Sequence, residues 1–310
     1  MAYVFFLSGE HPNLAKAEVE TLFGKVIVIS SELLLLETDE IDLTLALRLA
    51  YTRRIGKVIR DVQHEEELLD LVLKNTFKIT VENISGQGPT SKSLADNLYG
   101  RQTSPEVDIH HPTHHYVFFW VTDIIYVTEE IYFNDDNPHT RRSHLKLYNH
   151  PTSMHPKLAR AMINLAVSDG FIDPFCGAGG LVIEGKLMGL NVQGSDISAE
   201  LVGKARENAQ ELSVKANFTK KDALTLEEKA LAIITDLPYG KNSTITEGIN
   251  SLYEKFFFLA QDLTEKLVIG VANTTDIESL LGKTSWTIKN SFEIYIHKSL
   301  TRKIIVLEKN

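Results

Sequence analysis

The residues best suited to chemistry stand where an apolar stretch in the second half of the chain ends. Asp236, Leu237, Pro238 and Tyr239 follow the partly β-branched stretch 231–235, which we predict to be a buried strand. Proline fixes its own backbone and extends the residue before it, so the carbonyl oxygens of Asp236 and Leu237 point in set directions. An acceptor-rich turn beside an aromatic ring suits a planar substrate that carries an exocyclic amine. An ordinary turn after a strand is the competing interpretation.

Three more carboxylates follow predicted strands further upstream. Asp173 opens the glycine-rich loop 173–180. Asp196 ends the next predicted strand about 20 residues later, and Asp222 follows the third. A glycine-rich loop between a strand and a helix lets a ligand approach the backbone closely, and a carboxylate ending the second strand accepts hydrogen bonds from ribose hydroxyls. Asp222 falls where the amine of an adenine ring would be read.

The glycine spacing decides between two nucleotide-like cofactors. A dinucleotide-binding loop requires G-x-G-x-x-G, whereas residues 177–180 of this chain read GAGG, which disfavours NAD. The aspartate that opens the loop suits a cationic ligand with an amino-acid tail, and S-adenosylmethionine is such a ligand. Cys176 lies inside this loop, away from the turn at Asp236, so we expect a packed thiol rather than a nucleophile.

These residues need a sheet whose strands end at one edge. From residue 155 onward, predicted strands and helices alternate, which is typical of a parallel α/β sheet. The predicted strands are 171–173, 192–194, 218–220, 231–235 and 267–271, and the predicted helices are 156–166, 181–188, 199–211, 249–263 and 275–281. An antiparallel pair at 286–296 and 301–307 completes the sheet.

The first half of the chain is predicted to be α+β. Strands 3–7, 25–29 and 33–36 with helices 8–23 and 42–50 follow the βαββα order of a ferredoxin-like module. Further on we expect helices at 65–74 and 93–99, a strand at 77–81, and a pair of strands at 107–109 and 116–121 that 124–127 extends. Residues 133–152 are polar and aperiodic, which predicts a linker.

Length and composition limit the class of protein. The 310 residues favour two domains of ordinary globular composition. Cys176 is the single cysteine, which excludes an internal disulfide and a cysteine-based zinc site and indicates a reducing cytoplasm. The apolar run at the start is too short for a signal peptide, and no run reaches the length of a membrane helix. We therefore expect a cytoplasmic protein that contacts no membrane.

Any nucleic-acid surface must be local, because the net charge is −9 and the acidic excess lies almost entirely in the first 150 residues. Two basic clusters are candidates for phosphate contacts. Arg53, Arg54 and Lys57 form the first, and the pair Arg141 and Arg142 within the predicted linker forms the second. Solvated charge without a ligand is the alternative for both clusters.

Four histidines between residues 110 and 115 raise the question of a zinc site. Pro112 prevents the helical spacing that would place two of them on one face, and no cysteine or nearby carboxylate completes a ligand set. We predict a solvated hairpin loop here and no bound metal.

Several motifs together resemble one enzyme family. The loop 173–179 (DPFCGAG) with the turn 236–239 (DLPY) resembles the class I methyltransferases that modify exocyclic amines. Stretches 151–161 (PTSMHPKLARA), 297–302 (HKSLTR) and 51–56 (YTRRIG) narrow this to the archaeal tRNA guanine-10 N2-methyltransferases, although the resemblance is dense only after residue 141. Two positions depart from the family pattern: Leu237 replaces a proline, and Ala178 replaces a frequent threonine.

The resemblance implies an α/β fold in which a class I Rossmann-like methyltransferase domain follows a smaller α+β half. The methyltransferase sheet would be mostly parallel with an antiparallel last strand. The implied domains are a ferredoxin-like segment at 1–50, a THUMP-like RNA-binding domain at 51–132, a linker at 133–152 and the methyltransferase domain at 153–310. The implied cofactor is S-adenosyl-L-methionine, and the implied partner is tRNA rather than DNA. We expect a monomer, and the need for a small activating subunit stays open.

The implied activity is N2-methylation of guanosine in tRNA at position 10, with one or two methyl groups and the base flipped into a pocket at residues 236–239. The predicted site residues are, for catalysis, Asp236, Leu237, Pro238 and Tyr239; for the cofactor, Asp173, Phe175, Gly177, Gly179, Asp196, Ile197, Asp222, Ala223 and Ser153; and for RNA, Arg53, Arg54, Lys57, Arg141 and Arg142. Three alternatives stay open: guanine-N2 methylation elsewhere in tRNA or ribosomal RNA, adenine-N6 methylation of nucleic acid, and a catalytically silent RNA-binding subunit.

Overall fold

The computed structural model describes residues 1–74, 76–102, 106–141, 154–166, 168–239, 248–298 and 300–309. The chain forms two compact units. Unit 1 comprises Met1–Pro12, Phe23–Ala46 and Tyr51–Asp135, and unit 2 comprises Asn13–Leu22, Leu47–Ala50 and Asp136–Asn310. None of the described helices is long and apolar enough to cross a membrane.

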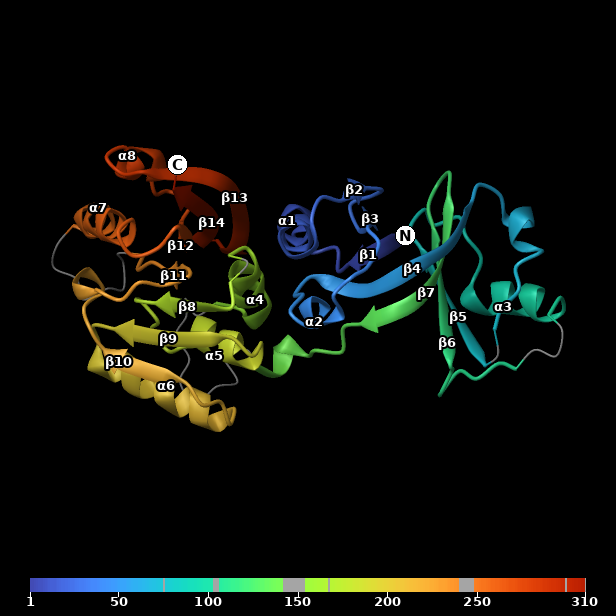
Figure 1. Ribbon diagram of the computed structural model, residues 1–310, viewed down its shortest axis with the longest axis horizontal. Helices are drawn as coiled ribbons and strands as arrows, with labels where there is room; N and C mark the ends of the chain where they lie inside the picture. Colours follow the sequence, from blue (N-terminus) through green and yellow to red (C-terminus); the bar gives the residue numbers. More distant parts are fainter. Residues whose placement is uncertain are drawn as a thin grey trace. The chain divides into compact units, whose positions relative to one another are not determined.

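Unit 2 is built on a seven-stranded sheet of order β10-β9-β8-β11-β12-β14-β13 (Figure 1). Its strands are β8 (Gly170–Asp173), β9 (Asn191–Asp196), β10 (Asn217–Lys220), β11 (Ile233–Asp236), β12 (Lys266–Ala272), β13 (Trp286–His297) and β14 (Leu300–Lys309). Strands β8 to β12 pair in parallel, and β14 is antiparallel to both of its neighbours. The predicted Rossmann-like sheet with an antiparallel last strand is confirmed.

The helices of unit 2 begin and end within a few residues of their predicted bounds. They are α4 (Pro156–Asn164), α5 (Gly180–Leu187), α6 (Ala199–Glu211), α7 (Ile249–Ala260) and α8 (Ile277–Leu281). Alternate residues of β12, namely Leu267, Ile269 and Val271, are completely buried in one apolar cluster with residues of α7 and α8. Each such side chain contributes about 1.5–3 kcal/mol, so this packing fixes the position of β12 beside its neighbour β11.

Unit 1 is an α+β fold on one sheet of order β2-β3-β1-β4-β7-β6-β5 (Figure 1). Its elements are β1 (Ala2–Leu7), β2 (Ile27–Val28), β3 (Leu33–Glu37), α2 (Leu43–Ala46), β4 (Thr52–Val62), the 3-10 helix η1 (Glu65–Leu68), β5 (Phe77–Asn83), α3 (Ser91–Tyr99), β6 (His114–Trp120) and β7 (Ile125–Phe133). Neighbouring strands are antiparallel except β5 and β6.

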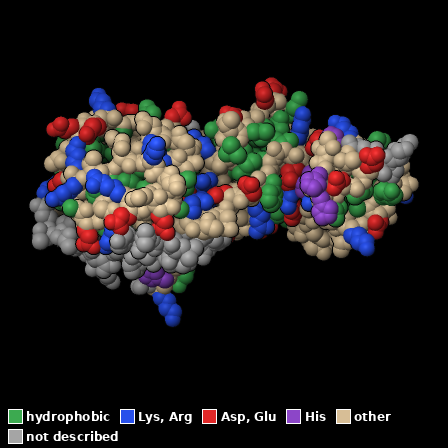
Figure 2. All heavy atoms as spheres, turned by 90° about the horizontal axis from the view of Figure 1, so that it is seen from below, with side chains coloured by type: hydrophobic (Ala, Val, Ile, Leu, Met, Phe, Trp, Pro, Cys, Tyr) green, Lys and Arg blue, Asp and Glu red, His purple; other side chains and the backbone are tan. Residues whose placement is uncertain are grey.

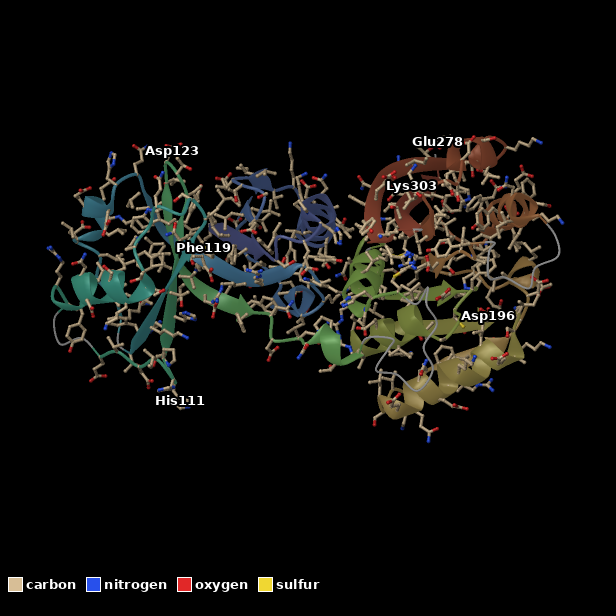
Figure 3. All side chains as sticks on the ribbon, turned by 180° about the vertical axis from the view of Figure 1, so that it is seen from behind. His111, Phe119, Asp123, Asp196, Glu278 and Lys303 are labelled. Carbon is tan, nitrogen blue, oxygen red and sulfur yellow. The ribbon has the colours of Figure 1, made fainter. Side chains whose placement is uncertain are left out.

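The sheet of unit 1 curves strongly. Phe119 of β6 and Phe6 of β1 have ring centroids 5.5 Å apart, although β4 and β7 separate their strands in the sheet. Flat strands about 4.8 Å apart would hold these rings much further from each other. In Figure 3, Phe119 lies between His111 and Asp123, which stand beyond the two ends of β6.

Several predictions for the first half are wrong. Residues 52–62, to which no strand was assigned, form the long strand β4. The helix expected over 65–74 is limited to η1, because Leu68, Leu71 and Leu73 all enter one apolar cluster. The expected pairing of 107–109 with 116–121 does not form: Val107 makes an isolated bridge to Phe77, and β6 pairs with β5 and β7 instead.

Part of helix α1 (Pro12–Phe23) belongs to unit 2, where a buried polar network holds it. Glu18 is completely buried, and its Oε1 accepts hydrogen bonds from Ala50 N (2.8 Å) and Asn164 Nδ2 (2.7 Å). Asn164 of α4 also accepts from Arg48 Nε (3.2 Å) and donates to Arg48 O (2.9 Å). These contacts join α1 and residues 47–50 to the core of unit 2.

Glu18→Ala should lower the free energy of unfolding by about 3 kcal/mol, because it leaves buried donors of Ala50 and Asn164 without their acceptor. Glu18→Gln keeps an acceptor oxygen and should cost less. Glu20→Ala is the matched control on the same helix, since Glu20 makes only a half-exposed pair with Lys16 and such pairs contribute about 0.5 kcal/mol. Urea unfolding followed by circular dichroism measures all three, and equal losses at positions 18 and 20 would contradict the network.

Candidate active site

Four carboxylates meet at one edge of the unit 2 sheet. Asp173, Asp196 and Asp236 are the last residues of β8, β9 and β11, which are parallel, so their carboxyl ends lie side by side. Asp222 follows the end of β10, the neighbour of β9. Figure 3 labels Asp196 at this edge. The structure therefore brings together the carboxylates that sequence reasoning placed at successive strand ends.

Asp173 is almost completely buried, with 1% of its surface exposed. Its Oδ1 accepts hydrogen bonds from Thr235 Oγ1 (2.6 Å) on β11 and from Phe175 N (3.2 Å). Burial, with smaller contributions from the charges of Asp196 and Asp236, raises the pKa of Asp173 to about 7. A cation bound beside this group would favour its charged form.

The glycine loop is fixed against the end of β9. Gly177 N donates to Asp196 Oδ2 (2.9 Å), and Cys176 N donates to Ser195 O (2.9 Å). Gly177 (φ +51°) and Gly179 (φ +86°) adopt left-handed backbone conformations that favour glycine. A Cβ built at Gly177 would meet no atom within 4 Å, so the backbone of the loop borders open space at this residue.

Of the remaining predicted cofactor residues near this edge, some are apolar and one is a carboxylate. Ile197 is 54% exposed although it is large and apolar, and it directly follows Asp196. Asp222 Oδ1 accepts from Leu224 N (2.9 Å) and caps the 3-10 helix η4 (Ala223–Thr225). Phe175 packs edge-on against Phe256, with ring centroids 5.1 Å apart. Both apolar and carboxylate side chains therefore lie near the loop.

The turn after β11 is anchored at both ends. Leu237 is buried and donates its N–H to Gly270 O (2.8 Å) on β12, and Tyr253 of α7 donates its hydroxyl to Pro238 O (2.6 Å). The Asp236 side chain keeps 21% of its surface exposed. Burial raises the pKa of Asp236, although hydrogen bonds and a positive charge act against this rise. Tyr239 donates its hydroxyl to Asp236 Oδ1.

Arg302 of β14 contacts this turn, and it was not among the predicted site residues. This fully buried side chain comes from β14 and donates through Nη2 to Asp236 Oδ2 (2.9 Å) and through Nε to Tyr239 Oη (2.5 Å). Residues 297–302 supported the family resemblance, but no spacing rule connects Arg302 with a turn more than 60 residues upstream.

The predicted RNA-binding residues have different surroundings. Arg53 is exposed on β4 and donates to Ser8 O (3.1 Å), and Lys57 is half-buried on the same strand. Arg54 forms ion pairs with Glu130 and Glu82. On the face drawn in Figure 2, described Lys and Arg side chains are interspersed with Asp, Glu and His.

Arg141 is embedded in a compact ion network of unit 2. Its guanidinium makes bidentate hydrogen bonds to Asp136 (2.7 and 2.8 Å) and to Glu184 (2.9 and 3.1 Å), which Arg160 also contacts. These hydrogen bonds raise the pKa of Arg141 above its ordinary value although burial opposes the rise. Arg142 and Ser153, the other two predicted contacts of this region, lie outside the described residues.

His114 and His115 have carboxylate partners, and Cys176 is buried. The expected hairpin loop is wrong for His114 and His115, which begin β6 and contact Glu129 and Glu130, each at 2.7 Å. Across the described parts of the chain, no group of three or more His, Cys, Asp or Glu side chains could hold a metal ion. Cys176 is buried, and burial raises the pKa of its thiol, as expected for a packed residue.

Comparisons with known proteins identify relatives of this chain. Residues 143–303 match the family described as "RMKL-like, methyltransferase domain". The tRNA (guanine(10)-N2)-dimethyltransferase of Methanothermobacter thermautotrophicus is 31% identical over 341 residues, covering 100% of both chains. The enzyme of the same name from Methanocaldococcus jannaschii is 32% identical over 205 residues, covering 62% of this chain and 55% of the relative.

One solved structure shows that the fold extends over the whole chain. The crystal structure of TrmN from Thermus thermophilus matches with a TM-score of 0.51 and 17% identity, and the match covers 100% of both chains. At this identity the likeness concerns the fold alone.

Asp173→Asn should raise the free energy of unfolding at pH 8 by about 2 kcal/mol, because the wild type then holds a buried charge. The folded-state pKa of about 7 lies above the unfolded value, so this destabilisation is absent below about pH 4, grows between about pH 4 and about pH 7, and is complete above that range. Urea unfolding at pH 8 and at about pH 4 tests whether the substitution stabilises the protein only at the higher pH. Asp262→Asn, at an exposed position, is the control. A variant less stable than the wild type at pH 8 would contradict it.

Proposed function

We propose that this chain, which belongs to the family of the tRNA (guanine(10)-N2)-dimethyltransferases, methylates the N2 amine of guanosine 10 in tRNA with S-adenosyl-L-methionine as methyl donor. The observation that carries the proposal is the open glycine loop beside the Asp236 turn at one edge of a Rossmann-like sheet. The full-length similarity to the Methanothermobacter enzyme supports the substrate, and the name of that relative favours two methyl groups.

The residues around the glycine loop fit S-adenosylmethionine. Asp173 would bind the ammonium group of its amino-acid tail, and Asp196 its ribose hydroxyls. Asp222 and Ala223 would contact the adenine amine, while Ile197 offers an exposed apolar surface to the ring. When bound, this cofactor supplies an electrophilic methyl group on a positively charged sulfur.

The chain's own task at the turn is to make a weak nucleophile reactive. The lone pair of the guanine N2 amine is delocalised into the ring. Asp236 and the Leu237 carbonyl would accept hydrogen bonds from the two amine hydrogens and favour a geometry in which the lone pair is free for in-line attack. The cationic product is acidic, and its proton passes to Asp236 or to water. Positioning therefore supplies most of the rate.

Tyr239 would stack on the target base after the base has left its helix. Burial raises the pKa of Tyr239, so its hydroxyl remains protonated and can keep donating to Asp236 while the ring serves as a plate. Leu237 and Pro238 have structural roles. The buried side chain of Leu237 anchors the turn, and Tyr253 fixes the carbonyl of Pro238 by a hydrogen bond.

The amino-terminal half would hold folded tRNA by shape and phosphate, because double-stranded RNA offers side chains little sequence information. We interpret it as a ferredoxin-like segment and a THUMP-like domain, joined through residues 133–152 to the methyltransferase domain. Arg53 and Lys57 are the best candidates for phosphate contacts, since Arg54 and Arg141 are already paired with carboxylates. The proposal places the enzyme in the cytoplasm, without DNA or membrane as partner.

One experiment separates this function from its alternatives. Bulk tRNA lacking the modification is incubated with the protein and labelled S-adenosylmethionine, digested, and analysed as nucleosides. Methylguanosine and dimethylguanosine support the proposal, and mapping to position 10 distinguishes it from another tRNA site. Methyladenosine would indicate an adenine-N6 enzyme, and retained cofactor binding without transfer would indicate a silent RNA-binding subunit.

Asp236→Ala should abolish methylation while the dissociation constant for S-adenosylmethionine stays within about twofold, because Asp236 lies on the substrate side of the edge. A loss of about 100-fold or more in kcat is expected from removing the acceptor that orients the amine. Isothermal titration with the cofactor and a filter assay on tRNA measure the two effects. Near-normal turnover would contradict the role of Asp236.

Replacing Arg53 and Lys57 by Ala should weaken binding to all tRNAs alike and make binding less dependent on salt, by about one unit of slope for each lost phosphate contact. Arg60→Ala is the control on the same strand, because Asp70 already neutralises that guanidinium at 2.6 Å. Binding isotherms at several salt concentrations provide the slope. An unchanged slope would make Arg53 and Lys57 ordinary solvated charges.

A further inference from the structure

We propose that Arg302 is the positioning residue of this active site, fixing the carboxylate of Asp236 and the ring of Tyr239 together for the incoming base. The inference rests on the function proposed above. It assigns a role in that function to a residue of β14, which is far from the turn 236–239 in sequence but contacts it in the fold.

The three side chains form a closed ring of hydrogen bonds. Arg302 donates through Nη2 to Asp236 Oδ2 at 2.9 Å and through Nε to Tyr239 Oη at 2.5 Å. Tyr239 in turn donates its hydroxyl to Asp236 Oδ1. Each group thereby restrains the other two, and charge-assisted hydrogen bonds of this kind are stronger than neutral ones.

The neighbouring strand has a gap that permits this ring. Arg302 pairs with Ala272 of β12, and its side chain passes the position of Gly270 to reach Asp236 on β11. A Cβ built at Gly270 would lie 2.2 Å from Asp236 Oδ1 and 3.6 Å from Arg302 Cδ. Only glycine leaves room there for a carboxylate and a guanidinium that meet across a strand.

Arg302 also supplies the positive charge that the turn requires. Among the described titratable groups that face Asp236, the others are Asp173 of β8, Tyr253 of α7 and Tyr239, and none of these is a cation. Burial raises the pKa of Asp236, and Arg302 is the principal group that opposes this rise. An ionised carboxylate can accept an amine hydrogen through either oxygen, whereas a neutral carboxyl would present a hydroxyl donor on one of them.

The guanidinium supports the aromatic plate as well. Its Cζ lies 5.5 Å from the centroid of the Tyr239 ring, within the range of a cation–π contact. With Arg302 over one face and the hydroxyl held by two partners, the ring has a defined plane on which a flipped base can stack. A single residue thus couples the acceptor for the amine to the platform for the base.

The test compares the wild type with Arg302→Lys, Arg302→Gln and the control Lys303→Gln, which removes a charge from the next residue of β14 (Figure 3). Thermal unfolding and cofactor affinity establish that each variant folds and binds S-adenosylmethionine. Steady-state methylation of tRNA is then measured between about pH 5.5 and about pH 9, which separates kcat, KM and the acidic limb of kcat/KM.

Arg302→Lys keeps the charge but cannot donate to both partners in the geometry of a guanidinium, so kcat should fall about 10- to 100-fold with the acidic limb unmoved. In Arg302→Gln, kcat should fall further than in Arg302→Lys. The acidic limb of its kcat/KM profile should also shift upward by about one pH unit, because Asp236 then lacks its cation. Cofactor affinity should change less than about twofold in both variants, and Lys303→Gln should match the wild type.

Wild-type kcat in Arg302→Lys overturns the inference, as does an Arg302→Gln enzyme with the wild-type acidic limb. If Arg302→Gln does not fold, Arg302→Lys is combined with Tyr239→Phe, which removes the shared hydroxyl. If the double variant loses less kcat than the two single variants predict together, Arg302 positions the site through Tyr239. If the two losses in kcat are additive, the inference is overturned. A wild type that transfers no methyl group to guanosine overturns the proposed function and the inference with it, whereas an active wild type with unaffected variants overturns the inference alone.

Discussion

The parallel pairing of β8, β9 and β11 is the constraint on which the proposed active site depends. Because the three strands run in one direction, their last residues place the carboxylates of Asp173, Asp196 and Asp236 at a common edge. Burial at this edge, with a smaller contribution from the neighbouring charges of Asp196 and Asp236, raises the pKa of Asp173 to about 7. A cation beside buried carboxylates favours their charged forms, as Arg302 does at Asp236.

The carboxylates of this edge are held in two different ways. In the described structure, Asp173 and Asp196 receive hydrogen bonds from neutral donors, namely backbone amides and the Thr235 hydroxyl. Asp236 instead has a buried cation of its own in Arg302. Within the described part of the chain, Asp173 and Asp196 therefore have no cation as hydrogen-bond donor, whereas the charge of Asp236 is already compensated by Arg302. This difference agrees with the proposed roles, a cationic cofactor beside the first two carboxylates and a neutral amine beside Asp236. The carboxylates are chemically alike, so their different roles follow from the groups that donate hydrogen bonds to each of them.

The parallel half was predictable because local patterns agree with the fold. Alternating strands and helices gave the elements of unit 2, and aspartates at strand ends gave the carboxylates of the site. In unit 1, β4 was missed because Arg53, Arg54 and Lys57 interrupt its apolar pattern, although Ile55, Val58, Ile59 and Val62 are β-branched. Arg302 could not be found, since it reaches Asp236 across a strand through a relationship that exists only in three dimensions.

Leu237, in the turn after β11, shows how a departure from a sequence motif can be compensated locally. A proline at position 237 would stiffen the turn but would have no N–H. Leu237 donates this N–H to Gly270 O at 2.8 Å and buries its side chain in the apolar cluster beneath the sheet. A hydrogen bond to β12 therefore replaces the rigidity of a ring. Gly270 accepts that bond with its carbonyl and, through its missing side chain, gives Asp236 and Arg302 the space in which they meet. The geometry of the turn thus depends on β12 as much as on its own four residues.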